Sequence, residues 1–335
     1  MGSQFVDMNA DGHLDYLTAT FDGSPHVAYG SEEGFGEPEH VLDKHGERII
    51  VTHYWDFDQE KHVVDHRSFG EGDSRTERCV SAWAWDWDAD GDLDLLLGTY
   101  ENGRLYRQMN EGTQTEPKFT GKNIEVMAGD APFALPAKMT APRMVDWDSD
   151  GDLDIIVGSF GDSYGQDAEG GGVYLARNTG EKGKPVFAAL ETLIEPSKKG
   201  HESAVRPDAG LYPDAVDWDG DGDLDLVVGG YSMWTPEGRE LTAEEQAEVE
   251  DLTKKRDAFQ KKQMELGQAY SKAYQDQEGK DPESEEVKKA LADAMAVYRK
   301  AAGELQKEMK PTMDRLAELV PSPKREAFVW LYERK

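Results

Sequence analysis

Short apolar runs recur along the first two-thirds of the chain, and an acidic turn comes directly before each one. The full copies are Leu93–Tyr100, Leu153–Phe160 and Leu224–Tyr231, and a weaker copy begins at Leu14. The runs are partly β-branched and contain glycine near their ends, which is typical of buried strands bounded by turns. This pattern predicts a strand behind each acidic turn.

Each predicted strand opens a repeating unit, and the units begin roughly 60 to 80 residues apart. A second strand is expected near His26, Arg104 and Gly172, and a short proline-containing element follows each of them. An apolar segment such as Ala141–Val145 or Tyr212–Val216 then leads into the next acidic turn. Several short strands per unit are typical of a β-propeller blade, whereas a β-sandwich would lack the long period.

The acidic turn is a nine-residue phrase that is complete at Asp86–Asp94, Asp146–Asp154 and Asp217–Asp225. A weaker copy occupies Asp7–Asp15, where Asn9 replaces one aspartate. Alternate carboxylates followed by glycine describe a tight loop around a hard cation. Calcium accepts about six to eight oxygen ligands at flexible angles. We therefore expect side chains at the first, third, fifth and ninth positions to bind calcium, with the carbonyl of the seventh.

Two alternatives to this calcium loop can be weighed from the sequence. An EF-hand needs a glutamate at the twelfth position and a following helix. The four loops have Leu97, Val157, Val228 and Thr18 at that position, and apolar runs follow, which excludes an EF-hand. Acidic turns that bind nothing are disfavoured, because each full copy would crowd five carboxylates together without a neutralising cation.

The candidate metal ligands are the alternate residues of the four loops, and up to four calcium ions are expected. They are Asp7, Asn9, Asp11, His13, Asp15, Asp86, Asp88, Asp90, Asp92, Asp94, Asp146, Asp148, Asp150, Asp152, Asp154, Asp217, Asp219, Asp221, Asp223 and Asp225. No catalytic residue is assigned.

The acidic phrase, its strand and the Asn-x-Gly that ends the second strand at Asn110 and Asn178 together resemble the FG-GAP/VCBS repeats. Those repeats occur in integrin-α-like propellers and in many secreted bacterial proteins. The resemblance covers about residues 4–234. It implies a mainly β fold, a calcium-binding β-propeller with about four visible blades, and a secreted, periplasmic or cell-surface location. It implies no reaction.

The sequence begins directly at its first loop. We therefore expect an incomplete ring, and a secretion signal that has been removed or a chain that is a fragment. Residues 240–321 depart from the repeat. A capping box at Thr242–Glu245 precedes a long apolar stripe, and a second stripe follows a turn at Gly279 and a helix start at Asp281-Pro282.

Two such stripes predict an antiparallel helical hairpin of coiled-coil type. Pro311 should break or kink the second helix, so that a shorter helix follows it as far as Val320. Residues 326–335 resemble the second strands of the earlier units. The hairpin is therefore expected to be an insertion between the first and second strands of the fourth blade.

Composition narrows the range of partners. The formal net charge of −31 disfavours nucleic acid and anionic membrane surfaces. No run approaches the roughly 20 apolar residues of a membrane span. Cys79 is the single cysteine, so an intrachain disulfide is impossible.

Residues 51–78 form the longest departure from the repeat, and they are rich in polar chemistry. They include His53, Asp56, Asp58, His62, Asp65, His66 and Arg67. An irregular polar loop on the propeller face is the default expectation. Within it, the run around His53 is interpreted as a strand and the run from His62 to His66 as its hairpin partner, and the spacing of four between these two histidines leaves a zinc or catalytic site as an alternative. The tryptophan at the second loop position (Trp87, Trp147 and Trp218) could stack on sugars, but packing between blades is the favoured interpretation.

The sequence thus favours a non-catalytic, calcium-stabilised scaffold for an unidentified protein or glycan ligand. One alternative is a carbohydrate-active lyase or hydrolase that uses the segment from His53 to Arg67. Another is an oligomeric assembly protein that associates with itself through the helical hairpin.

Overall fold

The computed structural model describes residues 2–70, 72–138, 140–161, 170–197, 206–234, 236–277, 280, 284–322 and 324–334. The chain divides into two compact units. The first comprises Met1–Trp234 and Arg325–Lys335 and consists of small β-sheets, whereas the second, Thr235–Lys324, contains two long helices.

The described residues of the first unit form four antiparallel sheets of three or four strands. The first sheet is ordered β1 (Ser3–Val6), β2 (Asp15–Ala19), β3 (Pro25–Ala28) and β6 (Glu39–His40). The second is ordered β9 (Cys79–Trp85), β10 (Asp94–Thr99), β11 (Leu105–Gln108) and β12 (Ile124–Glu125). The third contains β15 (Ala141–Val145), β16 (Asp154–Gly158), β17 (Val173–Ala176) and β18 (Glu191–Ile194). The fourth contains β19 (Ala209–Val216), β20 (Asp225–Trp234) and β21 (Lys324–Tyr332).

Three two-stranded hairpins complete the described strands. They are β4 (Gly30–Ser31) with β5 (Gly34–Phe35), β7 (His53–Asp56) with β8 (Lys61–Val64), and β13 (Met127–Ala128) with β14 (Ala131–Pro132). The predicted strands behind the acidic turns are confirmed as β2, β10, β16 and β20. The mainly β class is therefore confirmed. No closed ring of sheets is identified among the described residues, so the propeller stays a prediction.

The core of this unit lies between successive sheets. Leu95 and Leu97 of β10 join a cluster with Leu17 of the first sheet, and all three side chains are at most 1% exposed. Between them, Leu96 points the other way and joins a cluster with third-sheet residues such as Ile155. Because side chains alternate along a strand, one strand supplies both clusters. This explains why β10 and β16 have apolar residues at successive positions rather than at every second one, whereas burial alternates along β2.

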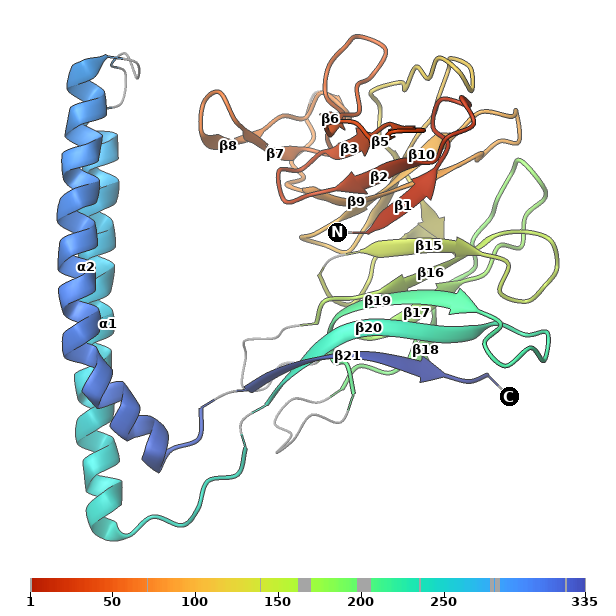
Figure 1. The fold of residues 1–335 in the computed structure, drawn as a ribbon. Helices are drawn as coiled ribbons and strands as arrows, with labels where there is room; N and C mark the ends of the chain where they lie inside the picture. Colours follow the sequence, from red (N-terminus) through yellow and green to blue (C-terminus); the bar gives the residue numbers. More distant parts are fainter. Residues whose placement is uncertain are drawn as a thin grey trace. The chain divides into compact units, whose positions relative to one another are not determined.

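The third and fourth sheets repeat this arrangement. Ile156 of β16 packs in a cluster with Leu226 and Val228 of β20. Figure 1 shows the sheets following one another in chain order within this unit. The fourth sheet is completed by β21, which pairs with β20 although about 90 residues separate them in the chain. The helical unit is thus inserted between two hydrogen-bonded strands of one sheet.

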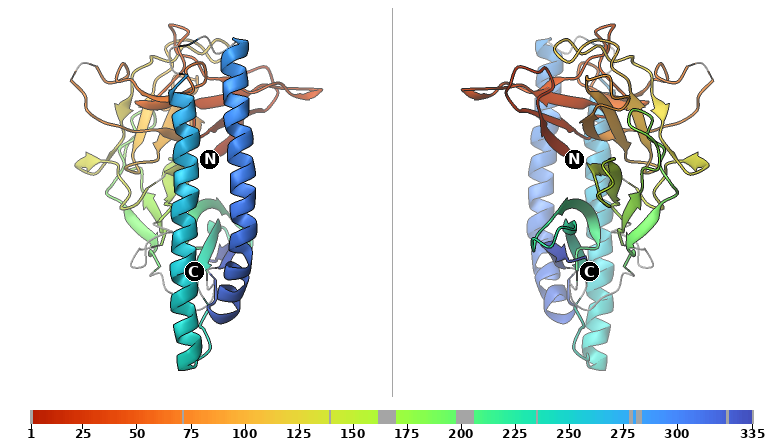
Figure 2. Two further views of the ribbon diagram at one scale, coloured as in Figure 1. Left: turned by 90° about the vertical axis from the view of Figure 1, so that its left-hand side faces the viewer. Right: turned by 90° about the vertical axis from the view of Figure 1, so that its right-hand side faces the viewer.

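The helical unit consists of α1 (Ala243–Gln275) and α2 (Glu285–Leu319). The predicted capping box is confirmed, because the Glu245 N–H donates to Thr242 Oγ1 and the Thr242 N–H donates to the Glu245 carboxylate. The helices run antiparallel and lie side by side (Figure 2). Arg315 of α2 pairs with Glu248 of α1 at 2.8 Å.

The second helix corrects one prediction. Of the predicted break or kink at Pro311, the break into a separate shorter helix is wrong, because α2 continues through this residue to Leu319, and the kink is confirmed (Figure 1). The last turns of α2 run at an angle to the rest (Figure 1), as expected where proline removes a backbone donor. Leu316 and Leu319 pack against Leu252 of α1, which holds the segment after the proline in helical form. The turn predicted at Gly279 and the helix start predicted at Asp281-Pro282 lie outside the described residues.

Candidate metal centre in the acidic loops

Each acidic loop connects the first two strands of its sheet. The loop at Asp86–Asp94, for example, leads from β9 into β10. Because the sheets share this strand order, the four loops lie at the same end of the sheets, on the right of Figure 1. The turn from the second to the third strand then lies at the opposite end, so the two ends of the sheets carry different chemistry.

In the first three loops the backbone wraps around the first aspartate, whereas in the fourth loop Asp217 Oδ1 accepts the Gly220 N–H at 2.8 Å. In the second loop, Asp86 Oδ1 accepts the Asp90 N–H at 3.1 Å and Asp86 Oδ2 accepts the Gly91 N–H at 3.1 Å. Asp146 makes the same two bonds to Asp150 and Gly151. The sixth residue must be left-handed for this path, and Gly12, Gly91, Gly151 and Gly222 have φ between 91 and 100°. These bonds form each loop from its own residues.

The first, third and fifth carboxylates of each complete loop come together. Asp86, Asp88 and Asp90 each offer an oxygen atom, and these oxygens all lie within 4.8 Å of one another. The same holds for the groups Asp146, Asp148, Asp150 and Asp217, Asp219, Asp221. Such oxygen-only groups fit a hard cation and do not suit the softer metals that prefer nitrogen or sulfur.

In two of the complete loops the seventh residue adds a carboxylate with one oxygen that has no hydrogen-bond partner. Asp92 Oδ1 is buried and makes no hydrogen bond, and the same is true of Asp223 Oδ1 in the fourth loop. Burial, together with the charges of Asp90, Asp88 and Asp86, raises the pKa of Asp92 above its ordinary value. A buried, unpaired oxygen beside other carboxylates is what a cation would compensate. The residues present therefore fit calcium.

The ninth aspartate lies outside these three-residue groups, and its main contacts are structural. Asp94 Oδ2 accepts the Trp87 N–H at 3.0 Å, and Asp94 Oδ1 accepts the Asn110 N–H at 2.7 Å. Burial raises the pKa of Asp94 to about 6. The same two positions donate to the ninth aspartate in every repeat: Met8 and Gly30 to Asp15, Trp147 and Asn178 to Asp154, and Trp218 and Arg334 to Asp225. The ninth aspartate therefore connects its loop to the residues that follow the next strand of the sheet, which is β3, β11, β17 or β21.

The first loop has a poorer donor set. Asn9 Oδ1 accepts the Asp11 N–H at 3.1 Å, and the Asn9 side-chain amide donates to Asp11 Oδ2 at 3.1 Å. Asp7 keeps its bonds to the backbone of Asp11 and Gly12. The loop therefore forms with two carboxylates and one amide where the complete loops have three carboxylates, and the His13 N–H donates to Asp11 Oδ1 at 2.9 Å. We expect this loop to bind a cation most weakly.

The tryptophans of the second loop position divide into two kinds. Trp87 and Trp147 are 7% and 5% exposed and belong to the clusters between sheets. Trp87 packs edge to face on Phe187, and Arg334 stacks over the Trp147 ring at 4.9 Å. Trp218 is 64% exposed. Packing between sheets, the favoured interpretation, therefore describes the first two and not the third.

The opposite end of the sheets carries the segment of residues 51–78. The predicted hairpin is confirmed as β7 and β8, with Trp55 opposite His62. The His62 ring lies against that of His53, with centroids 4.6 Å apart, whereas His66 Nδ1 lies 3.5 Å from Asp73. β8 ends at Val64, so the spacing of four no longer places the two histidines on one strand face. The zinc alternative for this pair therefore has no support in the structure.

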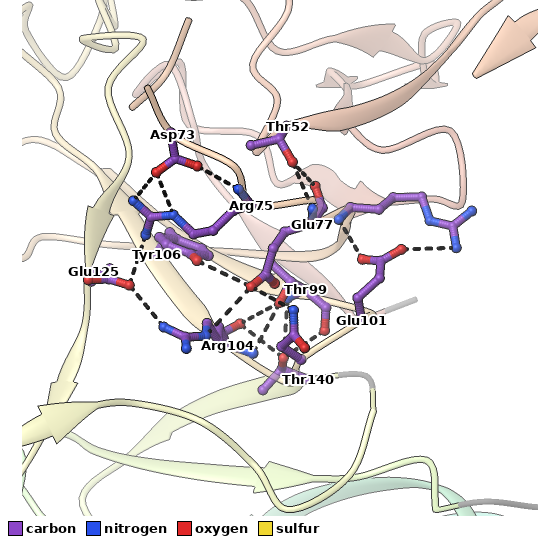
Figure 3. A network of polar contacts seen from close by, with 12 residues as sticks. Thr52, Asp73, Arg75, Glu77, Thr99, Glu101, Arg104, Tyr106, Glu125 and Thr140 are labelled. Carbon is purple, nitrogen blue, oxygen red and sulfur yellow. Dashed lines mark hydrogen bonds and ion pairs between the residues drawn. The ribbon is translucent and has the colours of Figure 1, made fainter. Parts of the chain in front are cut away.

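A buried glutamate anchors this segment, and sequence reasoning missed it. Glu77 is 1% exposed, and its carboxylate contacts Asn102 at 3.1 Å and Arg104 at 3.6 Å (Figure 3). Its N–H donates to Thr52 Oγ1 at 2.7 Å. One isolated glutamate before a strand gives no sequence signal of this role. The partners come from two stretches of chain that are distant from Glu77 in the sequence.

A second polar group at this end was also missed. Asp22, in the turn between β2 and β3, accepts hydrogen bonds or ion pairs from His26, His40 and Arg48. His40 and Arg48 also line a cavity of about 420 Å3 together with Tyr54, Phe57 and Arg67.

Comparison with known proteins supports the repeat assignment over part of the chain. Residues 86–157 match the family described as FG-GAP-like repeat. The matched segment holds the second and third acidic loops and the strands between them, so the FG-GAP resemblance is confirmed there. No curated protein matches the chain. Among the described residues, no helix is long and apolar enough to cross a membrane.

Proposed function

We propose that this chain is a calcium-stabilised scaffold of the β-propeller type that binds its ligand outside the cytoplasm and performs no catalysis of its own. The observation that carries the proposal is the repeated loop: four times, an acidic turn lies at the same end of a small sheet, and in three of them the backbone closes around the first aspartate in the same way. A family match over two of these loops supports an extracellular type of repeat.

Calcium is the cation that this donor set favours. Each complete loop offers carboxylates within 4.8 Å of one another, and a flexible oxygen shell suits calcium better than it suits magnesium, which demands near-octahedral geometry and keeps its waters. Calcium at millimolar concentration occurs outside the cytosol, where loops of moderate affinity are filled. Binding should be coupled to folding, because the clustered carboxylates repel one another until a cation arrives.

The propeller arrangement is supported by the way the sheets pack. Each sheet meets the next through an apolar cluster, and the central strands contribute side chains to both faces. Stacked four-stranded sheets with this order are typical of propeller blades. Further sheets at either end of this series would complete a ring.

The ligand should bind at the end of the sheets away from the calcium loops. The cavity of about 420 Å3 there combines Tyr54 and the 60% exposed Phe57 with the charged groups Arg48 and Asp56. Aromatic rings beside paired polar groups suit a glycan or a polar protein loop. A glycan array probed with the wild type and with Phe57→Ala tests this assignment, and Phe35→Ala is a matched control because Phe35 is 55% exposed and lies outside the cavity.

Thermal unfolding in calcium and in EDTA tests the central claim. A ligand at 100 times its dissociation constant stabilises a protein by about 2.7 kcal/mol per site, so EDTA should lower the Tm by several degrees. Asp88→Asn should remove part of this difference, whereas Asp130→Asn, an exposed acidic residue outside the loops, should leave it intact. Equal melting temperatures in calcium and EDTA would contradict the proposal.

A further inference from the structure

Asp22, His26 and His40 form a compact group whose geometry is set by the first sheet. Asp22 lies in the turn that joins β2 to β3, His26 lies on β3, and His40 lies on β6. His26 and His40 are directly opposite each other in the β3–β6 pairing. Residues opposite each other in a sheet present their side chains on the same face, which brings the two rings to a centroid distance of 4.3 Å.

Both imidazoles point the same nitrogen at the same oxygen. His26 Nε2 lies 2.9 Å and His40 Nε2 lies 3.0 Å from Asp22 Oδ2. The Asp22 side chain is 6% exposed, so this oxygen is withdrawn from water. The three donor atoms lie within 4.8 Å of one another.

The other oxygen of the carboxylate is held by the turn itself. Asp22 Oδ1 accepts the Thr20 hydroxyl at 2.7 Å and the Ser24 N–H at 3.2 Å. These two bonds fix the plane of the carboxylate and leave Oδ2 directed at the histidines. Such outer contacts orient the ligands in metal sites.

Arg48 is the neighbouring cation, and its bonds show that Asp22 Oδ2 is only one of its acceptors. Its guanidinium lies 3.2 Å from that oxygen, and it also donates to Ser24 Oγ at 2.8 Å, the Trp55 carbonyl at 3.0 Å and the Asp22 carbonyl at 3.2 Å. Arg48 can therefore release the carboxylate oxygen and keep three other hydrogen bonds. Its positive charge should weaken the binding of a cation without blocking it.

We propose that Asp22, His26 and His40 bind a transition-metal ion of the Zn2+ class through two imidazole nitrogens and one carboxylate oxygen. Imidazole nitrogen combined with one carboxylate suits zinc, whereas calcium selects oxygen alone. Three protein ligands leave one coordination position for water or a ligand. Because His40 also lines the cavity of about 420 Å3, the ion would lie at the wall of that cavity.

This site is independent of the acidic loops in both position and chemistry. Asp22 lies at the opposite end of its sheet from Asp7–Asp15, since β2 runs between them. The alternative is a network of hydrogen bonds alone, in which both Nε2 atoms keep their protons and donate to Asp22. The two differ in whether the Nε2 lone pairs accept a metal.

Titration of the full chain with Zn2+ and with Co2+ in excess calcium distinguishes a metal site from a network of hydrogen bonds alone. Calcium fills the acidic loops and suppresses binding of zinc to carboxylates alone. We expect one equivalent of Zn2+ to bind in isothermal titration calorimetry, and Co2+ to give a visible d–d absorption band. His26→Gln and His40→Gln should each weaken binding at least tenfold and abolish the band, while circular dichroism shows a folded protein.

Two control variants make the test specific. His62→Gln changes a histidine of the neighbouring hairpin, and Asp88→Asn changes a calcium loop, so neither should alter Zn2+ affinity. Wild-type protein that binds no stoichiometric Zn2+ would overturn the proposal. Binding that is unchanged in His26→Gln and His40→Gln would also overturn it. Because the readout is zinc binding at histidines, failure of the calcium proposal would appear separately, in the EDTA melt.

Discussion

The third and fourth acidic loops differ in sequence at one residue of nine, Ser149 against Gly220, yet their surroundings differ sharply. Trp147 in the third loop is 5% exposed, whereas Trp218 at the same position of the fourth is 64% exposed. Trp147 is covered because Arg334, at the end of β21, stacks on its ring and donates to its carbonyl at 2.7 Å. Trp218 lies outside the three core clusters.

The two loops share the contacts that are made among their own residues and differ in the contacts that they make with other parts of the chain. Both loops gather three carboxylates, and in both the ninth aspartate accepts the tryptophan N–H at 3.0 to 3.1 Å. These contacts span only a few residues, so the sequence alone secures them. The burial of the tryptophan depends on the next sheet in the series. The loop is thus a local unit, and its contribution to the core is a tertiary property.

Truncating the covered tryptophan should have the largest effect. Trp147→Ala removes a buried ring between the third and fourth sheets and should lower the free energy of unfolding by about 3–5 kcal/mol. Trp218→Ala removes an exposed ring and should change it by no more than about 0.5 kcal/mol. Urea unfolding in saturating calcium measures both. Equal losses of unfolding free energy in the two variants would show that burial of the tryptophan does not distinguish the third loop from the fourth.

Removing the ninth aspartate should have the next largest effect. Asp154→Ala leaves the N–H groups of Trp147 and Asn178 without an acceptor, and each unsatisfied buried group costs about 1–3 kcal/mol. Asp225→Ala should cost less, because its two donors, on Trp218 and Arg334, are only partly buried. The same urea unfolding experiment, with Asp154→Asn as a conservative control that keeps one acceptor, checks the order. A larger loss in Asp225→Ala would contradict it.

Exchanging the one residue that differs should have a smaller effect. Ser149 has φ of 61° and Gly220 has φ of 78°, a left-handed conformation that costs a side-chain-bearing residue about 1–2 kcal/mol. Ser149→Gly should therefore stabilise the protein by about 1 kcal/mol, and Gly220→Ser should destabilise it by a similar amount. Differential scanning calorimetry in calcium would register opposite shifts in Tm. Shifts of the same sign would show that something other than this φ angle decides the effect.

Chemical labelling of Cys79 should give the smallest effect of the four experiments. Its rate measures how often the interface between the first and second sheets opens. The thiol is fully buried between the first and second sheets, and burial raises its pKa to about 12. A raised thiol pKa keeps the native group protonated and unreactive, so labelling proceeds through transient opening, in which the thiol has an ordinary pKa of about 8.5. Raising the pH from about 7 to 9 should therefore speed labelling only through this opened state, and labelling in calcium should stay slow at both pH values. EDTA should speed labelling by favouring opening. Rapid labelling in calcium would show that this interface is loose.

Much of the first unit followed from the sequence because its signals are local. The acidic turns, their left-handed glycines and the apolar strands after them lie within about fifteen consecutive residues, so pattern and geometry agree. The capping box at Thr242–Glu245 is equally local and was found for the same reason. Trp218 was expected to be buried by analogy with Trp87 and Trp147. This prediction is wrong, because no neighbouring sheet packs on Trp218 among the described residues.

The polar groups at the opposite end of the sheets could not be predicted in this way. Asp22 and His40 are far apart in the chain and meet only because β6 pairs with β3 in one register. Glu77 meets Asn102 through the packing of residues 51–78 on the second sheet. Neither pair has a spacing that a sequence pattern would single out.

The sequence by itself determined the repeated unit of this protein: an acidic loop, a strand and a turn, in which every decisive contact joins near neighbours. It also determined the two helices, through their caps and apolar stripes. Only the tertiary structure decided which tryptophan is covered, which strand completes the fourth sheet, and which histidines share a carboxylate. The physical reason is range: hydrogen bonds within a turn are specified by adjacent residues, whereas burial and strand register depend on segments that the chain brings together only when it folds.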